Sequence, residues 1–522
     1  QADAMILINP LPCPGGRRLG PEHATRPASA RHRPLDFAQG GKAVPLVRCG
    51  EGKPMQPDEI QQADVVAFLS DPSAYGAKAP VEVITTHSAH VFLTGGLAFK
   101  IKRAVRYSYL DFSSLQARKT VLERELALNA PAAPDIYDRV VAVTREASGG
   151  LTLEGAGPAV EYALRMHRFP REAELNSIAD AGGLTVDLAR RLGAAVAAYH
   201  ADAERRSADG AALIGEILDE LREALGGMEA VLGRGRLAAF LESAEQAFTD
   251  AAPLLEKRAA AGIVRRCHGD LHLRNLVLIN GRVVPFDALE FDERLGTCDV
   301  FYDFGFLLMD LLHRGAQTQA NAALNSYLQD TGDLGGLAAL PLFMALRAAI
   351  RAMVTVQGMA GGASAEAARE ARAYLELAAA CLAPVPPRLV AVGGLSGTGK
   401  TTIAARITPV LKPLPGAVHL RSDVERKALF GASPLEHLPA ESYRPEVTAE
   451  TYTRLLNLAE LALRAGHSVI VDATFLQETY RNAVQKLAAR LQVPFDGIWL
   501  HGDPATLERR IAARTGDASD AD

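Results

Sequence analysis

Residues 268–287 read HGDLHLRNLVLINGRVVPFD. It begins with a polar loop around Asp270. Two short apolar runs follow, and the Asn-Gly pair at 280–281 joins them, which is the strongest short-range signal for a two-residue β-hairpin turn. The stretch therefore predicts a polar loop, then a hairpin, then a carboxylate at Asp287 directly after the second strand.

Three side chains of this stretch have the spacing of a phosphoryl-transfer site. Asn275 follows Asp270 by five residues, as in the catalytic loops of kinases, and Asp287 follows the hairpin. We predict that Asp270 accepts the proton of an acceptor hydroxyl, and that Asn275 and Asp287 bind Mg²⁺. One such loop alone can arise by chance, but a loop, a hairpin and a trailing aspartate together argue against coincidence.

The chain upstream of this loop supplies groups for nucleotide phosphates. Lys100 and Lys102 alternate in AFKIKR, so they lie on the same face of a predicted strand, and either one can contact the α- and β-phosphates. A solvated strand end is the alternative interpretation of Lys102. Glu125, on the following helix, is expected to orient the phosphate-binding lysine. That helix is predicted to begin with Ser113 and Gln116 as a capping box.

Two further positions complete the predicted ATP site of this part of the chain. Ser88 lies in a loop between two predicted strands, where it is expected to cover the phosphates. Met166 ends a later strand at the expected junction of two lobes, where the backbone is expected to contact adenine. His200 lies on the apolar stripe of a predicted helix and is interpreted as a core histidine.

Composition restricts the class of protein. The chain has 522 residues, of which 48% are hydrophobic and 22% are charged, so it is neither disordered nor membrane-spanning in composition. The net charge of the chain is −5, so the overall charge does not indicate a protein that binds nucleic acid by neutralising its phosphates. The five cysteines form no CxxC pair, which argues for a reducing compartment and against a disulfide or zinc framework. We expect a soluble, cytoplasmic protein.

The pattern of the chain changes at two places. An arginine-containing leader rich in Pro and Gly lacks apolar periodicity and is interpreted as a flexible tail. Later, three prolines in APVPPRL end a helical region, and strands then alternate with helices. The predicted organisation is a tail at 1–55, one domain at 56–382 with a small lobe at about 56–166 and a large lobe at about 167–382, a linker at 383–387, and a second domain at 388–522 that is expected to be truncated.

The second domain contains a phosphate-binding loop. GLSGTGKT at residues 394–401 fits GxxxxGK[ST] and lies between an apolar strand and a helix, as the motif requires. Lys400 is expected to contact the β- and γ-phosphates, and the Thr401 hydroxyl to bind Mg²⁺. The nucleotide-binding residues predicted here are Gly394, Ser396, Gly397, Thr398, Gly399, Lys400, Thr401 and Thr402.

The chemistry predicted for this loop is transfer to an acceptor. Asp472 ends a buried strand and is expected to be the second Mg²⁺ ligand; no glutamate follows it to polarise water. Asp423 is the candidate base that accepts the hydroxyl proton, and a helix N-cap is the alternative interpretation of this residue. Arg426 is the candidate group for binding the acceptor or its phosphate. Arg510 and Arg514 lie on one helix face and are candidates for a lid over the phosphoryl group, with a solvated helix face as the alternative.

These motifs resemble two known families. The chain from about Pro57 to Leu382 resembles the aminoglycoside-phosphotransferase and choline-kinase branch of the protein-kinase-like fold, through HGDLHLRN and the following FD. It has no APE segment, so the resemblance implies a small-molecule acceptor. The chain from Arg388 resembles P-loop kinases of the polynucleotide-kinase, gluconate-kinase and zeta-toxin type. The whole is similar to a bacterial two-domain family that fuses the two.

The resemblance implies a fold class and a function. We expect an α+β bilobal kinase-like domain followed by an α/β P-loop domain, whose parallel doubly wound sheet lacks its last edge strand. Both domains are expected to transfer the γ-phosphoryl of ATP, with Mg²⁺, to hydroxyl groups of small molecules, without a membrane partner. One alternative is a switch in which one nucleotide site controls the other. Another is that the C-terminal half is a polynucleotide or toxin-type kinase. Only under this alternative do we expect nucleic acid as a partner. The acceptor and the oligomeric state stay open.

Overall fold

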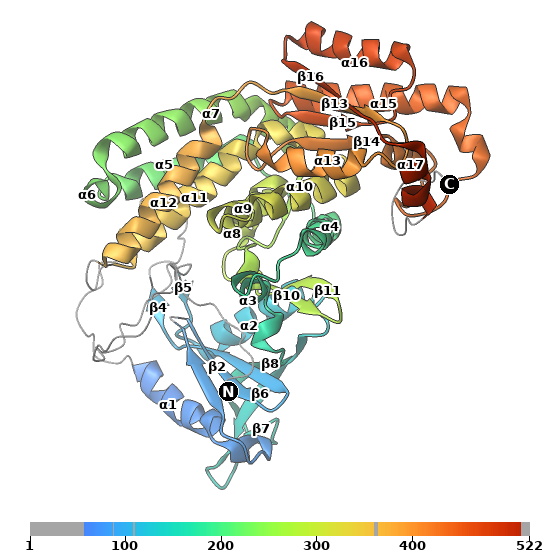
Figure 1. Ribbon diagram of the computed structural model, residues 1–522. Helices are drawn as coiled ribbons and strands as arrows, with labels where there is room; N and C mark the ends of the chain where they lie inside the picture. The colour runs from blue at the N-terminus through green and yellow to red at the C-terminus, as the bar shows by residue number, and fades with distance from the viewer. Residues whose placement is uncertain (1–56, 87, 108–109, 360–363, 513–522) are drawn as a thin grey trace, which may run out of the picture. The chain divides into compact units, whose positions relative to one another are not determined.

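The computed structural model of the chain describes residues 57–86, 88–107, 110–359 and 364–512 (Figure 1). Its described residues form two compact units. The first unit comprises the described residues up to Thr185, together with Ala195–Arg314 and Leu346–Ala378. The second unit comprises Val186–Ala194, Gly315–Ala345 and the described residues from Ala379 onward. The tail predicted at 1–55 lies outside the described residues.

The first unit contains an antiparallel sheet of six strands in the order β1-β2-β3-β8-β6-β7. Helix α1 (Pro57–Ser70) packs on one face of this sheet and helix α2 (Leu115–Asn129) on the other. The strands are β1 (Glu82–Thr85), β2 (Ala89–Thr94), β3 (Leu97–Lys102), β6 (Tyr137–Arg145), β7 (Leu151–Leu153) and β8 (Ala159–His167).

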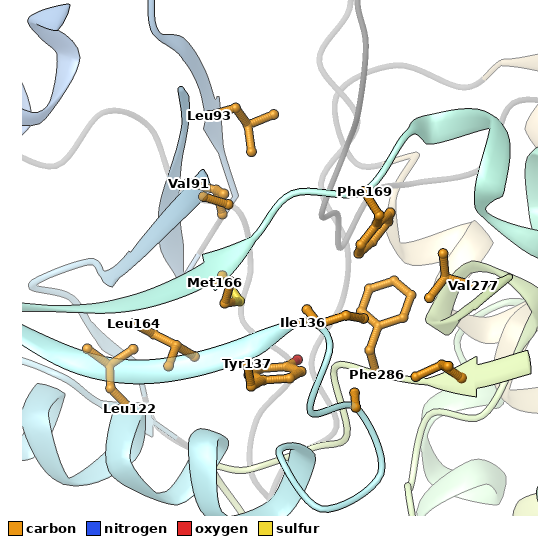
Figure 2. Packing of buried hydrophobic residues seen from close by; sticks show 13 residues of the cluster. Val91, Leu93, Leu122, Ile136, Tyr137, Leu164, Met166, Phe169, Val277 and Phe286 are labelled. Carbon is orange, nitrogen blue, oxygen red and sulfur yellow. The ribbon is translucent and has the colours of Figure 1, made fainter. Parts of the chain in front are cut away.

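The sheet is apolar on both faces because side chains alternate along each strand. Phe92 packs toward α1, whereas its neighbours Val91 and Leu93 pack on the opposite face. Figure 2 shows that second face, where Val277 and Phe286 from a later hairpin join the cluster. The sheet and the hairpin therefore share a core, and this shared core holds the predicted loop stretch against the sheet.

Helix α2 begins one residue later than the sequence predicts. Its N-cap is Ser114, whose side chain accepts a hydrogen bond from the Ala117 amide. The predicted capping box of Ser113 and Gln116 is wrong, because the Ser113 hydroxyl instead donates to Asp111 at 2.6 Å. Two adjacent serines both satisfy the sequence preference for an N-cap, and only the local turn selects between them.

The rest of the first unit is mainly helical. The predicted hairpin is confirmed: β10 pairs with β11, and Asn280 and Gly281 have φ values of 50° and 75°, as a type I′ turn requires. A short strand pair, β9 with β12, precedes and follows the hairpin. The elements are α3 (Leu175–Asp180), α5 (Gly210–Leu225), α6 (Glu229–Leu232), α7 (Arg234–Ala260), β9 (Val264–Arg266), β10 (Leu276–Ile279), β11 (Arg282–Pro285), α8 (Glu293–Gly296), β12 (Thr297–Asp299) and α9 (Val300–His313).

The second unit contains a parallel sheet of four strands in the order β14-β15-β13-β16. The alternation of strands and helices that the sequence predicts after the proline-rich segment is present. The elements are β13 (Leu389–Gly394), α13 (Lys400–Ile407), β14 (Val418–Arg421), α14 (Ser422–Leu429), α15 (Pro445–Arg464), β15 (Val469–Asp472), α16 (Glu478–Leu491), β16 (Phe495–Leu500) and α17 (Pro504–Ala512). Buried Val390, Val392 and Ile470 pack with Ala404 of α13. The α/β P-loop fold class is therefore confirmed.

The division of the chain differs from the predicted boundary at 383–387. Helix α10 (Gln317–Thr331) groups with the P-loop sheet, although the sequence places it in the first domain. Asn321 and Asn325 both donate side-chain hydrogen bonds to the Ala417 carbonyl, and the His419 amide donates to Asn325 at 2.7 Å. Helical periodicity does not reveal which sheet a helix covers, so the sequence assigns α10 only by its position in the chain.

Three helices, α4 (Val186–Asp202), α11 (Leu340–Gln357) and α12 (Ala365–Leu382), contribute residues to both units. One of them, α11, is long and apolar enough to cross a membrane. However, 67% of its apolar window is buried within the structure, as in the core helix of a globular protein. Among the described residues it is the one helix that meets these criteria.

Candidate functional site

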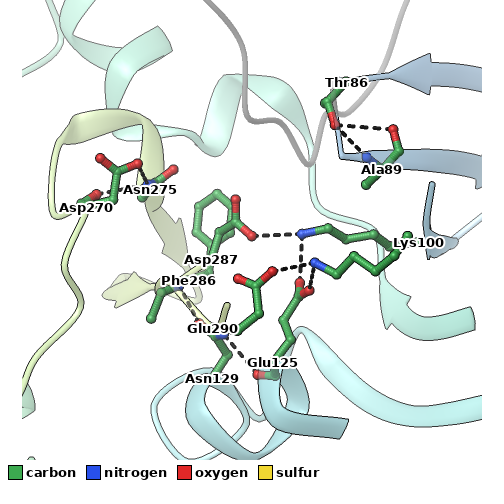
Figure 3. Close-up of polar contacts among 12 residues, drawn as sticks. Thr86, Ala89, Lys100, Glu125, Asn129, Asp270, Asn275, Phe286, Asp287 and Glu290 are labelled. Atoms are coloured by element: carbon green, nitrogen blue, oxygen red, sulfur yellow. Dashed lines mark hydrogen bonds and ion pairs between the residues drawn. The ribbon is translucent and has the colours of Figure 1, made fainter. Parts of the chain in front are cut away.

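A cluster of five charged side chains, four of them buried and the fifth, Glu290, partly buried, lies between the sheet of the first unit and the end of the hairpin (Figure 3). Lys100 contacts Glu125 at 2.8 Å and Asp287 at 2.9 Å. Lys102 contacts Glu125 at 2.7 Å and also pairs with Glu290. Both lysines therefore lie on one face of β3, as predicted, and one glutamate of α2 orients them both. With all groups ionised, two cations meet three carboxylates.

Charge balance within the cluster shifts the pKa values of its members. Burial alone would lower the pKa of Lys100, but Asp287 and Glu125 outweigh burial and hold that pKa well above its ordinary value. Burial would raise the pKa of Glu125, but the two lysines outweigh it and lower that pKa to about 2. Burial, together with the charge of Glu125, raises the pKa of Glu290. Glu290, which belongs to none of the predicted motifs, therefore takes up a proton more readily than an ordinary glutamate does.

The predicted catalytic loop brings Asp270 and Asn275 together. The Asn275 side-chain nitrogen donates to the Asp270 carbonyl at 2.9 Å and to its carboxylate at 3.0 Å. His272 Nε2 lies 3.4 Å from the same carboxylate. Burial would raise the pKa of Asp270, but His272 and His268 outweigh burial and lower it. Asp270 is therefore ionised at neutral pH.

A carboxylate on α9 holds the loop in place. Asp303 accepts hydrogen bonds from the His268 amide at 3.1 Å and the Gly269 amide at 2.8 Å, and His200 Nε2 lies 3.1 Å from it. Gly269 has a φ of +84°, and a Cβ there would lie 3.1 Å from the Leu295 carbonyl. The glycine of the motif is thus required by backbone geometry. His200 is buried, as expected of a core histidine, and it supports Asp303.

The backbone around Asp287 is also fixed by side chains. Asp287 has a φ of +61°, a left-handed conformation that aspartate tolerates better than most residues. Its amide donates to the Tyr137 hydroxyl at 3.0 Å, and the next amide, of Ala288, donates to Asn129 at 2.8 Å. These bonds compensate for the backbone strain and direct the Asp287 carboxylate toward Lys100 (Figure 3).

The donor set of this site fits Mg²⁺. The nitrogen of Asn275 is engaged by Asp270, so its amide oxygen is the atom that remains as a ligand. Asp287 supplies carboxylate oxygens within a cluster that carries one excess negative charge when all of its groups are ionised. Hard oxygen ligands and net negative charge are what Mg²⁺ selects in proteins.

The structure places two other predicted nucleotide contacts in buried positions. Ser88 is 9% exposed, and its carbonyl accepts the Arg103 amide. Met166 is fully buried, and its side chain belongs to the apolar cluster with Phe169 and Phe286 (Figure 2). Their contacts with phosphate and adenine stay predictions.

The phosphate loop of the second unit has the backbone that its motif requires. Gly394, Gly397 and Gly399 have φ values of 142°, 82° and 88°. The Thr401 hydroxyl donates to Asp472 at 2.7 Å, so the two predicted Mg²⁺ ligands lie together, and both offer oxygen. Lys400 donates to the Leu395 carbonyl at 3.0 Å. Ser396, Thr398 and Thr402 belong to the same loop and the first turn of α13.

Helix α17 packs on this loop. A Cβ at Gly397 would lie 2.9 Å from the Leu507 carbonyl. Arg510, on the same helix, donates to the Gly397 carbonyl at 3.4 Å. The structure thus places Arg510 at the phosphate loop, whereas Arg514 lies outside the described residues.

The other predicted groups of the second unit lie on α14. Asp423 is in the first turn of the helix and is partly exposed. Arg426 is buried, donates to the Ser442 carbonyl at 2.8 Å and lies over the Tyr443 ring. These contacts hold α14 against the segment after it, and the acceptor-binding role of Arg426 stays a prediction.

Fold and sites together define a two-domain, kinase-like layout: one unit with a Lys-Glu pair and a His-Gly-Asp loop, and a P-loop unit. Residues 389–522 match the family model described as an AAA domain. Two uncharacterised proteins, from Mycobacterium bovis and Mycobacterium tuberculosis strain H37Rv, are each 28% identical over 450 residues, which cover 84% of this chain and 88% of theirs.

The structure is also similar to solved structures of small-molecule kinases. A choline/ethanolamine kinase family protein from Mesorhizobium loti is 16% identical, with a TM-score of 0.37, covering 61% of this chain and 94% of that one. A choline kinase from Cryptosporidium parvum is 11% identical, with a TM-score of 0.35, covering 62% of this chain and 93% of that one.

Proposed function

We propose that this chain is an ATP-dependent phosphotransferase with two active sites, each acting on a hydroxyl group of a small molecule. The observation that carries the proposal is the convergence of Lys100, Glu125 and Asp287 in one buried cluster, with Asp270 and Asn275 on the loop before the hairpin. Stability alone does not explain why five charged side chains gather at this place, because buried ion pairs seldom stabilise a protein more than well-packed apolar residues do.

In the first unit, the acceptor oxygen attacks the γ-phosphorus of ATP. The bond between that phosphorus and the β–γ bridging oxygen breaks, ADP leaves, and the hydroxyl proton passes to Asp270. Asp270 is ionised, so it accepts the hydrogen bond of the hydroxyl before transfer. Glu125 holds Lys100 for the α- and β-phosphates, and the buried position of this pair excludes water.

Asn275 and Asp287 would hold Mg²⁺ in the first unit, and Thr401 and Asp472 in the second. When bound, Mg²⁺ neutralises phosphate charge in the transition state. In the second unit, Lys400 and Arg510 lie at the phosphate loop and supply the positive charge of the protein.

A second candidate function applies to the C-terminal half. The resemblance to polynucleotide and toxin-type kinases allows a nucleotide sugar or a 5′-hydroxyl end as its acceptor. This candidate requires an open anionic-ligand site beside Asp423, and the burial of Arg426 removes one of its cations.

The test is transfer of the γ-phosphoryl of labelled ATP to a panel of sugars, amino alcohols, hydroxy acids, nucleosides and 5′-hydroxyl oligonucleotides. Asp270→Asn is expected to abolish transfer by the first unit, and Lys400→Ala transfer by the second. Exposed Asp219→Asn is the matched control for the first variant. Transfer that survives in the double variant would contradict the proposal.

We place the protein in the cytoplasm. Among the described residues, Cys267, Cys298 and Cys381 are buried free thiols, which supports a reducing compartment.

A further inference from the structure

Glu125 is shared by two lysines, and each of them takes one of its carboxylate oxygens (Figure 3). Lys100 Nζ donates to Oε1 at 2.8 Å, and Lys102 Nζ donates to Oε2 at 2.7 Å. In a kinase-like site, one lysine of this strand is enough for the α- and β-phosphates. The other lysine therefore has a different task.

The contacts of Lys100 place it where the phosphates bind. Besides Glu125, Lys100 contacts Asp287 at 2.9 Å, and Asp287 is the carboxylate that would hold Mg²⁺. Metal ion and phosphates share one site in phosphoryl transfer, so a lysine beside the metal ligand is the one within reach of the phosphates. To bind a phosphate oxygen, Lys100 has to give up its contact with Asp287.

Lys102 has a different set of partners. Its side chain is 2% exposed, and its ammonium group contacts Glu125 and Glu290 and lies 5.9 Å from the centre of the Phe112 ring. The backbone at this position is held as well, because the Gln62 side-chain nitrogen donates to the Lys102 carbonyl at 2.7 Å. A buried lysine with two carboxylate partners and an aromatic neighbour is a fixed cation of the fold.

Glu290 belongs to a short segment that is anchored on two sides. The Ala288 amide donates to the Asn129 side chain of α2 at 2.8 Å. The Leu289 amide donates to the His268 carbonyl of the catalytic loop at 3.0 Å. The carboxylate of Glu290 therefore projects from a backbone that protein groups hold without the help of a nucleotide.

Resting on the proposed function, we propose that Lys102 and Glu290 are a positioning pair for the nucleotide site of the first unit. The pair fixes Glu125, and Glu125 thereby holds Lys100 for the phosphates. During turnover Lys100 alternates between Asp287 and phosphate oxygens, whereas Lys102 and Glu290 stay paired. Glu125 thus keeps one fixed partner while its other partner moves, and neither member of the pair touches the nucleotide.

The test replaces the pair by apolar side chains of similar size, in the full chain with Lys400→Ala so that the second unit binds no nucleotide. Lys102→Met/Glu290→Leu removes one cation and one anion, so the charge balance of the cluster is kept. Such a replacement of a buried ion pair is often neutral for stability, whereas removing one partner alone is not. We therefore expect the urea midpoint of the double variant to lie closer to that of its parent than the midpoint of Lys102→Met does.

Two ligands separate positioning from general damage. Calorimetry measures the affinity for Mg-ADP, and competition against Mg-ADP measures the affinity for adenosine. We expect the double variant to bind Mg-ADP about tenfold more weakly, because Lys100 is no longer held for charge-assisted hydrogen bonds to the phosphates. Adenosine has no phosphates, so its affinity should stay unchanged. A merely structural role predicts equal losses for both ligands.

A surface pair on the same helix is the matched control. Lys119 and Glu123 of α2 lie 3.6 Å apart and are both solvent-accessible. Lys119→Met/Glu123→Leu makes the same chemical change as the double variant and is expected to leave both affinities unchanged, because exposed ion pairs contribute little.

Glu290→Gln tests the inference if the double variant does not fold. It keeps Lys102 and the size of the side chain, and it removes a charge from a cluster in which carboxylates outnumber lysines. Lys102 then relies on Glu125 alone and draws that carboxylate away from Lys100. We expect Mg-ADP affinity to fall about threefold or more, with an unchanged circular dichroism spectrum.

Three results overturn the inference. The first is a folded double variant, or in its place a folded Glu290→Gln variant, that binds Mg-ADP as tightly as the parent. The second is an equal loss of affinity for Mg-ADP and adenosine. The third is a Glu290→Gln protein that does not fold, which would assign the pair to stability. Failure of the proposed function is seen separately in the parent, as Mg-ADP binding that is absent or that Lys100→Met leaves unchanged.

Discussion

A lysine that is removed from water keeps its charge only where carboxylates replace the solvent. Lys102 is 1% exposed and has two such partners, Glu125 and Glu290. The sequence allowed a solvated strand end for this residue, and the structure excludes that alternative. At this scale the function of a residue follows from what surrounds it: Lys100 contacts the candidate Mg²⁺ ligand Asp287, whereas Lys102 contacts Glu290.

Replacing Lys102 by Met is expected to destabilise the first unit by about 3–5 kcal/mol, because Glu125 and Glu290 lose a buried cationic partner. Urea unfolding followed by circular dichroism measures the change. Lys119→Met, on the surface of α2, is the matched control and should cost less than about 1 kcal/mol. A Lys102→Met protein as stable as the control would show that the cluster does not require this charge.

His467 makes the second unit sensitive to acid. Burial lowers its pKa to about 4, and its Nε2 lies 3.1 Å from the Leu337 carbonyl. The unfolded chain binds a proton at the ordinary histidine pKa of about 6.5, so between pH 6.5 and 4 it binds more protons than the folded chain. Stability from this residue is present above pH 6.5 and falls by about 3 kcal/mol as the pH drops toward 4.

Trp499, the one tryptophan in the sequence, lies in β16 and reports unfolding of the second unit by its fluorescence. Urea titrations at pH 7 and pH 4.5 should show a smaller loss of stability in His467→Gln than in the unaltered chain. Equal losses would mean that His467 is not buried in its neutral form.

At the scale of elements, α9 positions the catalytic loop through a single carboxylate. Asp303 binds two successive amides of the loop, so removing its charge should misplace Asp270 without touching either substrate. Helix α17 positions the phosphate loop in a similar way, because its residues Leu507 and Arg510 contact Gly397. In both units, a helix distant in sequence determines the geometry of a loop.

Asp303→Asn is expected to lower kcat of the first unit about 100-fold while KM for ATP changes little, because positioning is lost and nucleotide contacts are kept. Steady-state kinetics in the Lys400→Ala background measure the split. Asp219→Asn is the control, since that carboxylate is on the surface of α5. A variant that raises KM without changing kcat would contradict a positioning role.

Gly397→Ala is expected to weaken ATP binding by the second unit at least tenfold. The new Cβ would approach the Leu507 carbonyl to 2.9 Å, in addition to the strain of a φ of +82°. Gly431→Ala separates the two effects, because Gly431 has a φ of +65° and a Cβ added there would meet no atom within 4 Å. Equilibrium ATP binding, with Asp287→Ala to remove the first site, measures both; equal effects would argue against the contact.

For the whole molecule, the question is whether two ATP sites on one chain act independently. Each unit has its own lysine, its own pair of candidate Mg²⁺ ligands and its own core. If the two sites act independently, their ATP-binding free energies should be additive. If one site regulates the other, the two binding events should be coupled by a free energy of about 1–3 kcal/mol.

We expect the chain to bind two ATP molecules, and Asp287→Ala and Lys400→Ala each to remove one of them. Filling the second site should change the affinity of the first by less than about twofold, which corresponds to additive sites. Calorimetric titration of each variant measures both quantities. An affinity change of fivefold or more would favour the regulatory alternative over two independent enzymes.

Much of this protein could be predicted from local sequence. The hairpin with its Asn-Gly turn, the alternation of strands and helices in the second unit, the phosphate loop and the placement of both lysines on one face of a strand all depend on short-range periodicity or on local motifs. The cap of α2 was wrong by one residue, because Ser113 and Ser114 are chemically equivalent there. The assignment of α10 failed because an amphipathic helix does not encode which sheet it will cover.

What only the tertiary structure decided is which distant side chains share one environment. Glu290 belongs to no motif, and the contacts of Glu290 and Asp303 come from neighbours far away in the chain. Charge, pKa and ligand preference depend on the local dielectric and on distances of a few ångströms. A sequence specifies the chemical groups, but packing determines those distances, so the chemistry of the buried charge cluster became visible only in the folded chain.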